Sequence, residues 1–435
     1  DTHTLEFELN GPVPYFLKLM GFYPLSPVNR ECVEIGYPAW VQPENLVSNG
    51  PFLLQARRVR DRIRMVKNPN YWDKDNVHLN IIDALAVQSE TTALNLYMTG
   101  VCDWIPTVPS TVIPDIIKAK RTDFNPKPQL TIYFYEYNVS KPPFDNAKIR
   151  KALSLAIDRR EIVERVTKAG QIPAERFVPP GITEYDEIKK EHGVSGVPPA
   201  DPEKVQLEKN RVEARRLLAE AGFPGGKGLA KIELLHNTHD GHGRIAQLIQ
   251  SHWKSALGIN VEIVNKEWAS YLADRQQLKY QVCRAGWTGD YVDPNTFLDL
   301  FILKSPNNTT GFADKQYDEW IDQAETMKLT SEEHAALEAK VRKQAGWTEA
   351  KHLALFREAR DLAVQHKRME VFFKAENRLL DEQVIIPLYY YVSTSLVRPY
   401  VSGYYQNLQD HHPLKGIRVD AAARAEMLST GKARE

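Results

Sequence analysis

Short runs of alternating apolar and polar residues dominate the first third of the chain and predict strands separated by turns. Alternation begins at Thr4–Leu9, and the runs Leu53–Val59 and Arg62–Lys67 flank the turn Arg60-Asp61 as a hairpin. The longer run Gln129–Tyr137 is so aromatic that we expect a buried strand and not a surface edge. The first third is therefore predicted to be rich in sheet.

The middle of the chain carries the clearest repeating unit. Strand Lys231–Leu235, a helix through Ile245, strand Asn260–Val264, a helix from Trp268 and a strand through Arg284 follow one another. The apolar positions of the helices recur at three-to-four spacing, as in amphipathic helices. This β-α-β-α-β order predicts a parallel sheet with right-handed crossovers.

Further helices and one further strand are predicted around this unit. The helices are expected at Asp145–Ile157, Arg159–Lys168, Lys204–Ala221 and over most of Ser331–Arg378, the last as two long helices around Gly346-Trp-Thr. Val178–Asp201 is rich in Pro, Gly and Glu and predicts a long loop, and Val384–Val392 mirrors the aromatic strand at 129–137. Two aromatic strands that bracket a long α/β segment suggest one lobe inserted into another.

Composition excludes some classes of function. The 435 residues include 56 basic and 56 acidic side chains, so no net charge attracts nucleic acid or acidic lipid. No apolar run approaches the ~20 residues that span a bilayer. Cys32, Cys102 and Cys283 are odd in number and far apart, which predicts no disulfide framework. We find no P-loop, dinucleotide fingerprint, nucleophile elbow or HExxH.

One stretch concentrates candidate chemistry at the end of a predicted strand. Arg284, Trp287 and Asp290 place a cation, an indole and an anion within seven residues, and Asp293-Pro294 then reads as a helix N-cap followed by a proline at the first helical position. In open α/β sheets, ligands bind at the carboxyl ends of strands. The residues alone leave open a surface loop with one chance Arg–Asp pair, and an acid/base pair of Asp290 and Asp293 has no further support.

Three histidines give a second candidate. His236, His239 and His242 are spaced by three residues, with Asp240 between them, in a predicted strand-to-helix loop. Imidazole and carboxylate suit Zn or Ni. Since a loop does not place them on one helix face, one functional histidine is favoured over a metal site.

The chain resembles the extracytoplasmic solute-binding proteins of family 5, the peptide and nickel receptors of ABC transporters, most closely the oligopeptide-binding type. Each matching segment is weak alone, but their order and spacing from near residue 1 to about 419 are specific. They are Pro12-Val-Pro-Tyr-Phe16, Ser48-Asn-Gly-Pro-Phe52, Asn68-Pro-Asn-Tyr-Trp72, Tyr135-Glu-Tyr-Asn138 with Lys141-Pro-Pro-Phe144, Ala152–Asp158, Leu217–Gly222, Arg284–Tyr291 and Pro387–Tyr391.

The resemblance implies an α/β fold of the periplasmic-binding-protein type, class II, with two lobes, mixed or parallel sheets flanked by helices and a hinge. By this likeness Asp290 would bind a peptide's α-ammonium, and Arg284 and His242 would meet its carboxylate. Trp268 and Trp287 would wall side-chain pockets. The other ligand-binding candidates are Tyr135, Tyr291 and Tyr390.

The resemblance also implies a domain plan. Residues 39–138 and 389–420 would form the first lobe, and 139–388 the second, with a helical insertion at about 340–370. Residues 1–38 would be the remnant of a small extra domain, and 421–435 a tail, frayed or disordered. Family proteins begin well before residue 1 of this chain, which opens without Met, so we expect a processed protein or a fragment. Some members carry cysteines where Thr131 and Thr288 stand, which implies a lost disulfide and an ordinary buried thiol at Cys283.

The implied function is an oligopeptide receptor in the periplasm or at the extracytoplasmic face of the membrane. It would need no catalysis, cofactor, metal or nucleic acid, would act as a monomer and would meet the membrane only through the permease subunits or a lipid anchor. Two alternatives stay open: the ligand-sensing domain of a transcriptional regulator, and a receptor of the same fold for a dipeptide, nickel, a metal chelate, haem or a sugar.

Overall fold

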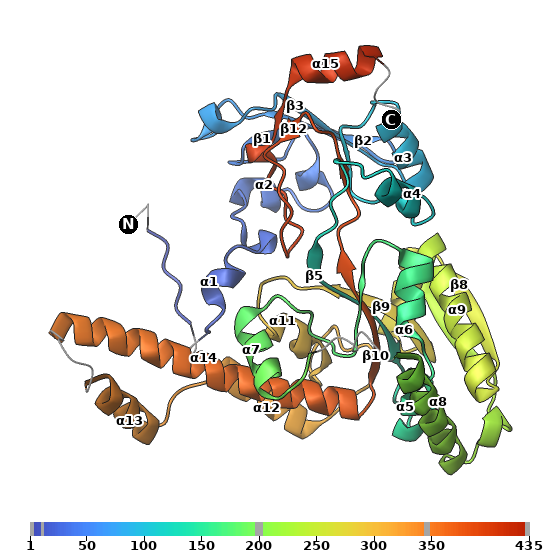
Figure 1. Ribbon diagram of the computed structural model, residues 1–435. Helices are drawn as coiled ribbons and strands as arrows, with labels where there is room; N and C mark the ends of the chain where they lie inside the picture. Colours follow the sequence, from blue (N-terminus) through green and yellow to red (C-terminus); the bar gives the residue numbers. More distant parts are fainter. Residues whose placement is uncertain (1–3, 10–12, 196–202, 343–348, 431–435) are drawn as a thin grey trace. The chain divides into compact units, whose positions relative to one another are not determined.

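The computed structural model describes residues 4–9, 13–195, 203–342 and 349–430, which belong to two compact units (Figure 1). Unit 1 comprises Asp1–Gly21, Leu130–Val166 and Ile172–Tyr391, and unit 2 comprises Phe22–Gln129, Thr167–Gln171 and Val392–Glu435. The sequence placed the main junctions at 138/139 and 388/389, whereas the compact units divide at 129/130 and 391/392. The difference arises because both aromatic strands pair within the sheet of unit 1.

Unit 1 is built on a six-stranded mixed sheet with the order β6-β10-β5-β9-β7-β8. The strands are β5 (Pro128–Tyr137), β6 (Ile172–Pro173), β7 (Ile232–Asn237), β8 (Val261–Lys266), β9 (Val282–Thr288) and β10 (Ile385–Val392). Strand β7, next to the edge strand β8, is parallel to β8 and β9, while β5 is antiparallel to β9. The predicted β-α-β-α-β unit is therefore confirmed.

Helices cover both faces of this sheet. The helices of unit 1 are α1 (Phe16–Leu19), α5 (Ala147–Leu155), α6 (Arg159–Glu161), α7 (Thr183–Glu191), α8 (Glu203–Glu220), α9 (Asp240–Leu257), α10 (Trp268–Gln276), α11 (Asn295–Leu298), α12 (Lys315–Glu325), α13 (Ser331–Arg342) and α14 (Glu349–Asp381). The odd-numbered tyrosines of β5 pack with α5, α8 and α9. On the other face Phe134 of β5 meets Phe177, which also meets Phe297 of α11.

Helix α9 shows how local sequence sets these elements. Its apolar residues Ile245, Ile249 and Trp253 recur every four residues and are all buried. Gly258 ends the helix at φ +71°, a left-handed conformation that glycine adopts without strain. The Trp253 Nε1 donates to the Leu153 carbonyl at 2.9 Å and so ties α9 to α5.

Two predictions of local structure were wrong. Thr4–Leu9 is irregular, with exposed Leu5 and Phe7, because alternation forms a strand only where another strand can pair with it. The stretch predicted as the loop Val178–Asp201 contains α7, whose Tyr185 and Ile188 are buried. The Pro and Gly residues around α7 hid its short amphipathic pattern.

The helical region near the carboxyl end of unit 1 agrees with the prediction of two long helices. Helix α13 packs on α14, and α14 continues past the expected insertion at 340–370 to Asp381. Gly346-Trp-Thr lies outside the described residues. The tail from Asp420 begins as a helix, α15 (Ala421–Thr430), and 431–435 lie outside the described residues.

Unit 2 holds a three-stranded antiparallel sheet and two pairs of short strands. The sheet is β1 (Phe52–Arg58), β2 (Arg62–Lys67) and β3 (Ile81–Leu85), the short pairs are β4 (Trp104–Ile105) with β11 (Leu396–Val397) and β12 (Val401–Ser402) with β13 (Arg418–Val419), and the helices are α2 (Arg30–Glu34), α3 (Glu90–Met98), α4 (Ile113–Lys118) and α15. The hairpin of β1 and β2 is confirmed, with Arg60 turning at φ +59°. Of the helices in the described parts of the chain, none is long and apolar enough to cross a membrane.

Candidate ligand-binding site

Arg284 lies within strand β9, third of its seven residues, and not at the strand end that the sequence predicted. In the antiparallel register it stands opposite Tyr135 of β5, and Gly286 stands opposite Tyr133. Directly opposed residues share a face of the sheet. Arg284 therefore projects on the same side as Tyr133 and Tyr135, the side that α9 covers.

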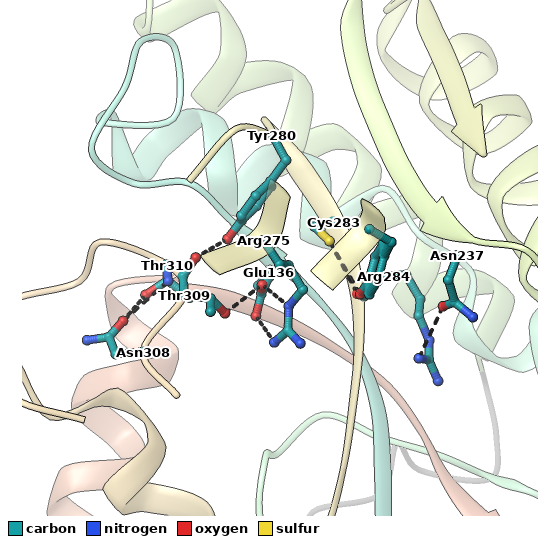
Figure 2. Close-up of polar contacts among 10 residues, drawn as sticks. Glu136, Asn237, Arg275, Tyr280, Cys283, Arg284, Asn308, Thr309 and Thr310 are labelled. Carbon is teal, nitrogen blue, oxygen red and sulfur yellow. Dashed lines mark hydrogen bonds and ion pairs between the residues drawn. The ribbon is translucent and has the colours of Figure 1, made fainter. Parts of the chain in front are cut away.

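The guanidinium of Arg284 meets three neutral side chains from three strands. Its Cζ lies 4.9 Å from the centre of the Tyr133 ring. Nη2 donates to the Tyr391 hydroxyl at 3.3 Å and Nη1 to Oδ1 of Asn237 at 3.5 Å, the second contact being drawn in Figure 2. Both hydrogen bonds are long, and the buried Nε has no hydrogen-bond partner among the described residues. Since a guanidinium has five N–H donors, most of its capacity is unused.

Two other arginines of unit 1 that are largely removed from water are neutralised by carboxylates. Arg275 pairs with Glu136 at 2.6 Å, and Figure 2 shows Thr309 joining that pair. Arg368 pairs with Asp293 at 2.6 Å. In the described part of the chain, no ion pair joins Arg284 to any acid, Asp290 included. The chance Arg284–Asp290 pair left open by the sequence is therefore absent, and Arg284 is suited to an external anion.

His242 lies beside Arg284 in the first turn of α9. Its Nδ1 is 3.3 Å from the Tyr133 hydroxyl. Burial and the charge of Arg284 hold the pKa of His242 well below its usual range, and His239 and His236 add to this effect. The imidazole is neutral at pH 7, so it can donate or accept a hydrogen bond but adds no second positive charge. The amino end of the 18-residue helix α9 favours an anion at the same place.

The three histidines do not gather into a metal site. Nδ1 of His236 lies 2.9 Å from the Asn237 carbonyl, and Nδ1 of His239 accepts from the Gly241 amide at 3.1 Å as the N-cap of α9. Across the described residues, no group of metal-ligating side chains includes any of the three. His242 is the one that faces Arg284.

Asp290 follows the end of β9 in a tightly held loop. A Cβ at Gly289 would lie 2.7 Å from Cδ2 of Leu130, so only glycine fits that close approach. The Asp290 amide donates to Oγ1 of Thr296 at 3.0 Å. Burial raises the pKa of the Asp290 carboxyl. A carboxylate that is partly removed from water is stabilised by a nearby cation.

The residues after Asp290 hold the loop in place from behind. The ring of Tyr291 is buried and stacks on Tyr15 with centroids 4.9 Å apart. Oδ1 of Asp293 accepts from the Asn295 amide at 3.0 Å, but α11 begins at Asn295 with Pro294 as its N-cap, so the predicted N-cap at Asp293 lies one residue too early. Since its carboxylate also pairs with Arg368, Asp293 has a structural role and is not an acid/base partner of Asp290.

The two tryptophans occupy different surroundings. Trp268 begins α10, is 49% exposed and stacks on Tyr271, whose hydroxyl donates to the Arg284 carbonyl. Trp287 stands opposite Ile132. Because successive side chains of a strand point to opposite faces, Trp287, three residues after Arg284, lies on the other face of β9. The structure thus connects Trp268 to the Arg284 backbone through Tyr271, whereas Trp287 lies on the opposite face of β9.

Two of the tyrosine candidates lie in the interior of unit 1. Tyr135 is fully buried beside Tyr133. Tyr390 is 2% exposed, and its hydroxyl donates to the Arg176 carbonyl at 3.0 Å. The neighbouring Tyr391 reaches Arg284 instead, because successive residues of β10 point to opposite faces.

Sequence reasoning missed three contacts of Arg284, namely Tyr133, Tyr391 and Asn237. The alternation of strands β5 and β10 carried part of the signal, since it separates odd-numbered from even-numbered tyrosines. Which odd-numbered tyrosine lies over Arg284 depends on the pairing between strands. Asn237 had no local signal, because it reaches Arg284 from the end of another strand.

Comparison of the sequence with known families and proteins gives a consistent match. The model of the family described as "Bacterial extracellular solute-binding proteins, family 5 Middle" matches residues 1–309. The periplasmic oligopeptide-binding protein OppA of Salmonella typhimurium is 35% identical over 407 residues, which cover 93% of this chain and 66% of that protein. The chain thus spans just under two thirds of the length of this relative.

Solved structures give the same picture. The murein tripeptide binding protein MppA of Escherichia coli matches with a TM-score of 0.79 at 29% identity, covering 96% of this chain and 73% of MppA. OppA of Haemophilus influenzae in complex with RPPGFSPFR matches with a TM-score of 0.76 at 30% identity, covering 95% of this chain and 72% of that one. These likenesses confirm the expected fold class, an α/β fold of the periplasmic-binding type with a mixed sheet flanked by helices.

Proposed function

Because the chain belongs to family 5 of the bacterial extracellular solute-binding proteins, we propose that it is the substrate-binding component of an ABC transporter that captures oligopeptides. It acts outside the cytoplasm, delivers its ligand to the permease subunits and meets the membrane only through them or a lipid anchor. The chain binds its ligand and catalyses no reaction.

One observation carries the proposal: Arg284 is a partly buried cation whose described hydrogen-bond and ring partners are all neutral. A carboxylate that entered beside it would form charge-assisted hydrogen bonds with the unused guanidinium N–H groups. The Tyr391 hydroxyl, neutral His242 and the amino end of α9 lie on the same side of the sheet and favour the same charge. The terminal carboxylate of a peptide is an anion of this kind.

Asp290 supplies the opposite charge within the same unit. It follows Arg284 by six residues, beyond the end of β9, and its carboxyl is partly buried. In the proposal it binds the α-ammonium of the peptide, so that the two termini of a zwitterion meet the two ends of one site. Of the aromatic candidates, the exposed Trp268 is the one proposed to contact the peptide's side chains, whereas the buried Tyr291 supports the Asp290 loop.

The energetics require no further interaction. A micromolar dissociation constant corresponds to about −8 kcal/mol. Hydrogen bonds to charged groups contribute roughly 1.5–3 kcal/mol each, so two terminal contacts and a few main-chain bonds suffice. Because every peptide carries these groups, the proposed selectivity is for peptides as a class and not for one sequence.

Calorimetry with matched ligands tests the proposal. The protein is unfolded and refolded to remove bound ligand, then titrated with trialanine, N-acetyl-trialanine and trialanine amide at pH 7. We expect trialanine to bind and each blocked form to bind at least about tenfold more weakly, which is about 1.4 kcal/mol per lost contact. Equal binding of the blocked forms, or a non-peptide ligand found by native mass spectrometry of the freshly purified protein, would overturn the proposal.

A further inference from the structure

Four side chains that can bind a metal lie together where α7 meets α14. Glu191 ends α7 and His192 follows it as the C-cap, while His366 and Glu370 belong to α14. Figure 1 shows α7 beside α14, and the two helices are in contact. None of the four belongs to the site around Arg284.

The helical repeat of α14 explains why these residues face α7. His366, Glu370 and Phe373 follow one another at intervals of four and three, so they lie on one stripe of the helix. Glu376 continues the stripe and is fully buried, where it accepts from the Tyr185 hydroxyl of α7 at 2.7 Å. The buried contact holds α7 against α14, and the four polar side chains lie at another point of the same helix–helix interface.

The side chains are positioned closely by their neighbours. The ring of His192 stacks on Phe373 with centroids 4.4 Å apart and planes 17° from parallel. Its Nε2 is 3.1 Å from both carboxylate oxygens of Glu370. Nε2 of His366 is 3.2 Å from Oε2 of Glu191. Each histidine therefore turns the same ring nitrogen toward a carboxylate.

Three of the four ligand atoms already lie close enough to share one cation. Ligand atoms of Glu191, His366 and Glu370 lie within 4.8 Å of one another, and Nε2 of His192, 3.1 Å from Glu370 but outside this group of three, would turn toward the ion as a fourth ligand. In a zinc site with bonds of ~2.0–2.1 Å, neighbouring donors stand roughly 3.3 Å apart, close to the nitrogen–oxygen separations within the two His–Glu pairs, and binding would draw the pairs together. We propose that Glu191, His192, His366 and Glu370 form a surface site for one divalent transition metal ion, with Zn²⁺ as the best match to two imidazoles and two carboxylates.

The simpler interpretation is two exposed His–Glu pairs. The side chains of Glu191 and His366 are 54% and 55% exposed, and an exposed pair of this kind contributes little to stability. A metal ion would differ by joining all four side chains at once. Because Glu191 and His366 are 175 residues apart in sequence, bound metal would clamp α7 onto α14.

Titration with zinc alone separates the two interpretations. The full chain, without a histidine tag, is treated with EDTA, dialysed and titrated with ZnCl₂ by calorimetry, with a thermal melt recorded in parallel. We expect one zinc ion per chain with a micromolar or lower dissociation constant, and a melting temperature raised by several degrees. Cobalt(II) should give the intense visible bands of tetrahedral coordination.

Matched variants locate the binding. H192Q/H366Q should lose the zinc affinity at least 100-fold and lose the shift in melting temperature, while its circular dichroism and its melt with EDTA match the parent. Glu370→Gln should weaken binding less, and H239Q/H242Q, altered in the other histidine cluster, should bind zinc as the parent does. Absence of zinc binding, or zinc binding unchanged in H192Q/H366Q, would overturn the proposal.

Discussion

The guanidinium of Arg284 lies over the ring of Tyr133, with 4.9 Å between its Cζ and the ring centre, on a sheet face where its other hydrogen-bond partners are also neutral. A cation–π contact of this kind contributes about 1–2 kcal/mol and cannot replace a carboxylate partner. Arg284 is therefore held in place without being neutralised.

Replacing Arg284 by methionine should weaken binding without harming the fold. We expect Arg284→Met to lose about 2–5 kcal/mol of affinity for trialanine, the usual effect of removing one member of a buried charge pair. Its urea midpoint should equal or exceed that of the parent, because no internal ion pair is broken. Tyr391→Phe removes one 3.3 Å contact and is the milder control. Unchanged affinity in Arg284→Met would show that the anion binds elsewhere.

The raised pKa of Asp290 predicts a pH dependence of binding. An ordinary aspartate has a pKa of about 3.9. Burial stabilises the protonated carboxyl of Asp290 and raises its pKa, so Asp290 loses its charge at a higher pH than an ordinary aspartate does. The ligand's ammonium stays charged through this range, and affinity should therefore fall as the solution is acidified from pH 7. Asp290→Asn should bind weakly at every pH and show no such fall. If the affinity of the parent protein, measured by calorimetry, stays constant as the pH falls from 7 to the ordinary aspartate pKa, Asp290 does not bind the ammonium.

The buried pair of Arg368 and Asp293 should matter more for stability than any surface pair on α14. Their side chains are 0% and 2% exposed. Arg368→Met would leave the buried carboxylate of Asp293 unpaired and should lower the free energy of unfolding by about 3–5 kcal/mol. The matched control is Arg360→Met on the same helix, which breaks an exposed contact with Asp361 and should change the unfolding free energy by less than about 1 kcal/mol. Urea unfolding measures both; equal effects would refute the distinction.

Asp299 should make the protein less stable as pH rises. Burial, with the charges of Glu325, Asp290 and Asp293, raises the pKa of Asp299 to about 7. The folded state then binds the Asp299 proton more tightly than the unfolded state does. The contribution of this proton to the free energy of unfolding is complete below pH ~4 and is lost as the pH rises from ~4 to ~7. Three pKa units correspond to about 4 kcal/mol at most.

The replacement Asp299→Asn removes this titration. Urea midpoints of parent and variant should differ little at pH 4.5, and the variant should be the more stable at pH 8. A parent and variant that lose stability in parallel between these two values would show that other groups account for the slope.

Thr131 and Thr288 stand directly opposite each other on β5 and β9, with their Oγ1 atoms 3.0 Å apart. The double variant Thr131→Cys/Thr288→Cys should form a disulfide in air, seen as a loss of two hydrogen masses and of two reactive thiols. A gain of about 2–4 kcal/mol in unfolding free energy is expected. Gln129→Cys/Thr288→Cys, displaced along β5, is the control. The native Cys283 is buried, and burial raises the pKa of its thiol, so it should not compete.

The order of strands and helices around Arg284 could be predicted from the sequence because it depends on neighbours along the chain. The spacing of Ile245, Ile249 and Trp253 predicts helix α9, and the β-prone run before Gly286 predicts β9. The motif from Arg284 to Tyr291 also pointed to the family. These signals extend over a few residues, which is the range of helical periodicity and strand alternation.

The tertiary structure alone decided which side chains meet. Tyr391 and Asn237 reach Arg284 from strands far away in sequence, and Asp293 is paired by Arg368 from α14, so neither the neutral surroundings of Arg284 nor the structural role of Asp293 has a local signature. The four side chains between α7 and α14 are likewise brought together only by helix packing. The physical reason is common to all of them: local sequence sets the conformation of each element, whereas the pairing of charges depends on how distant elements pack and exclude water.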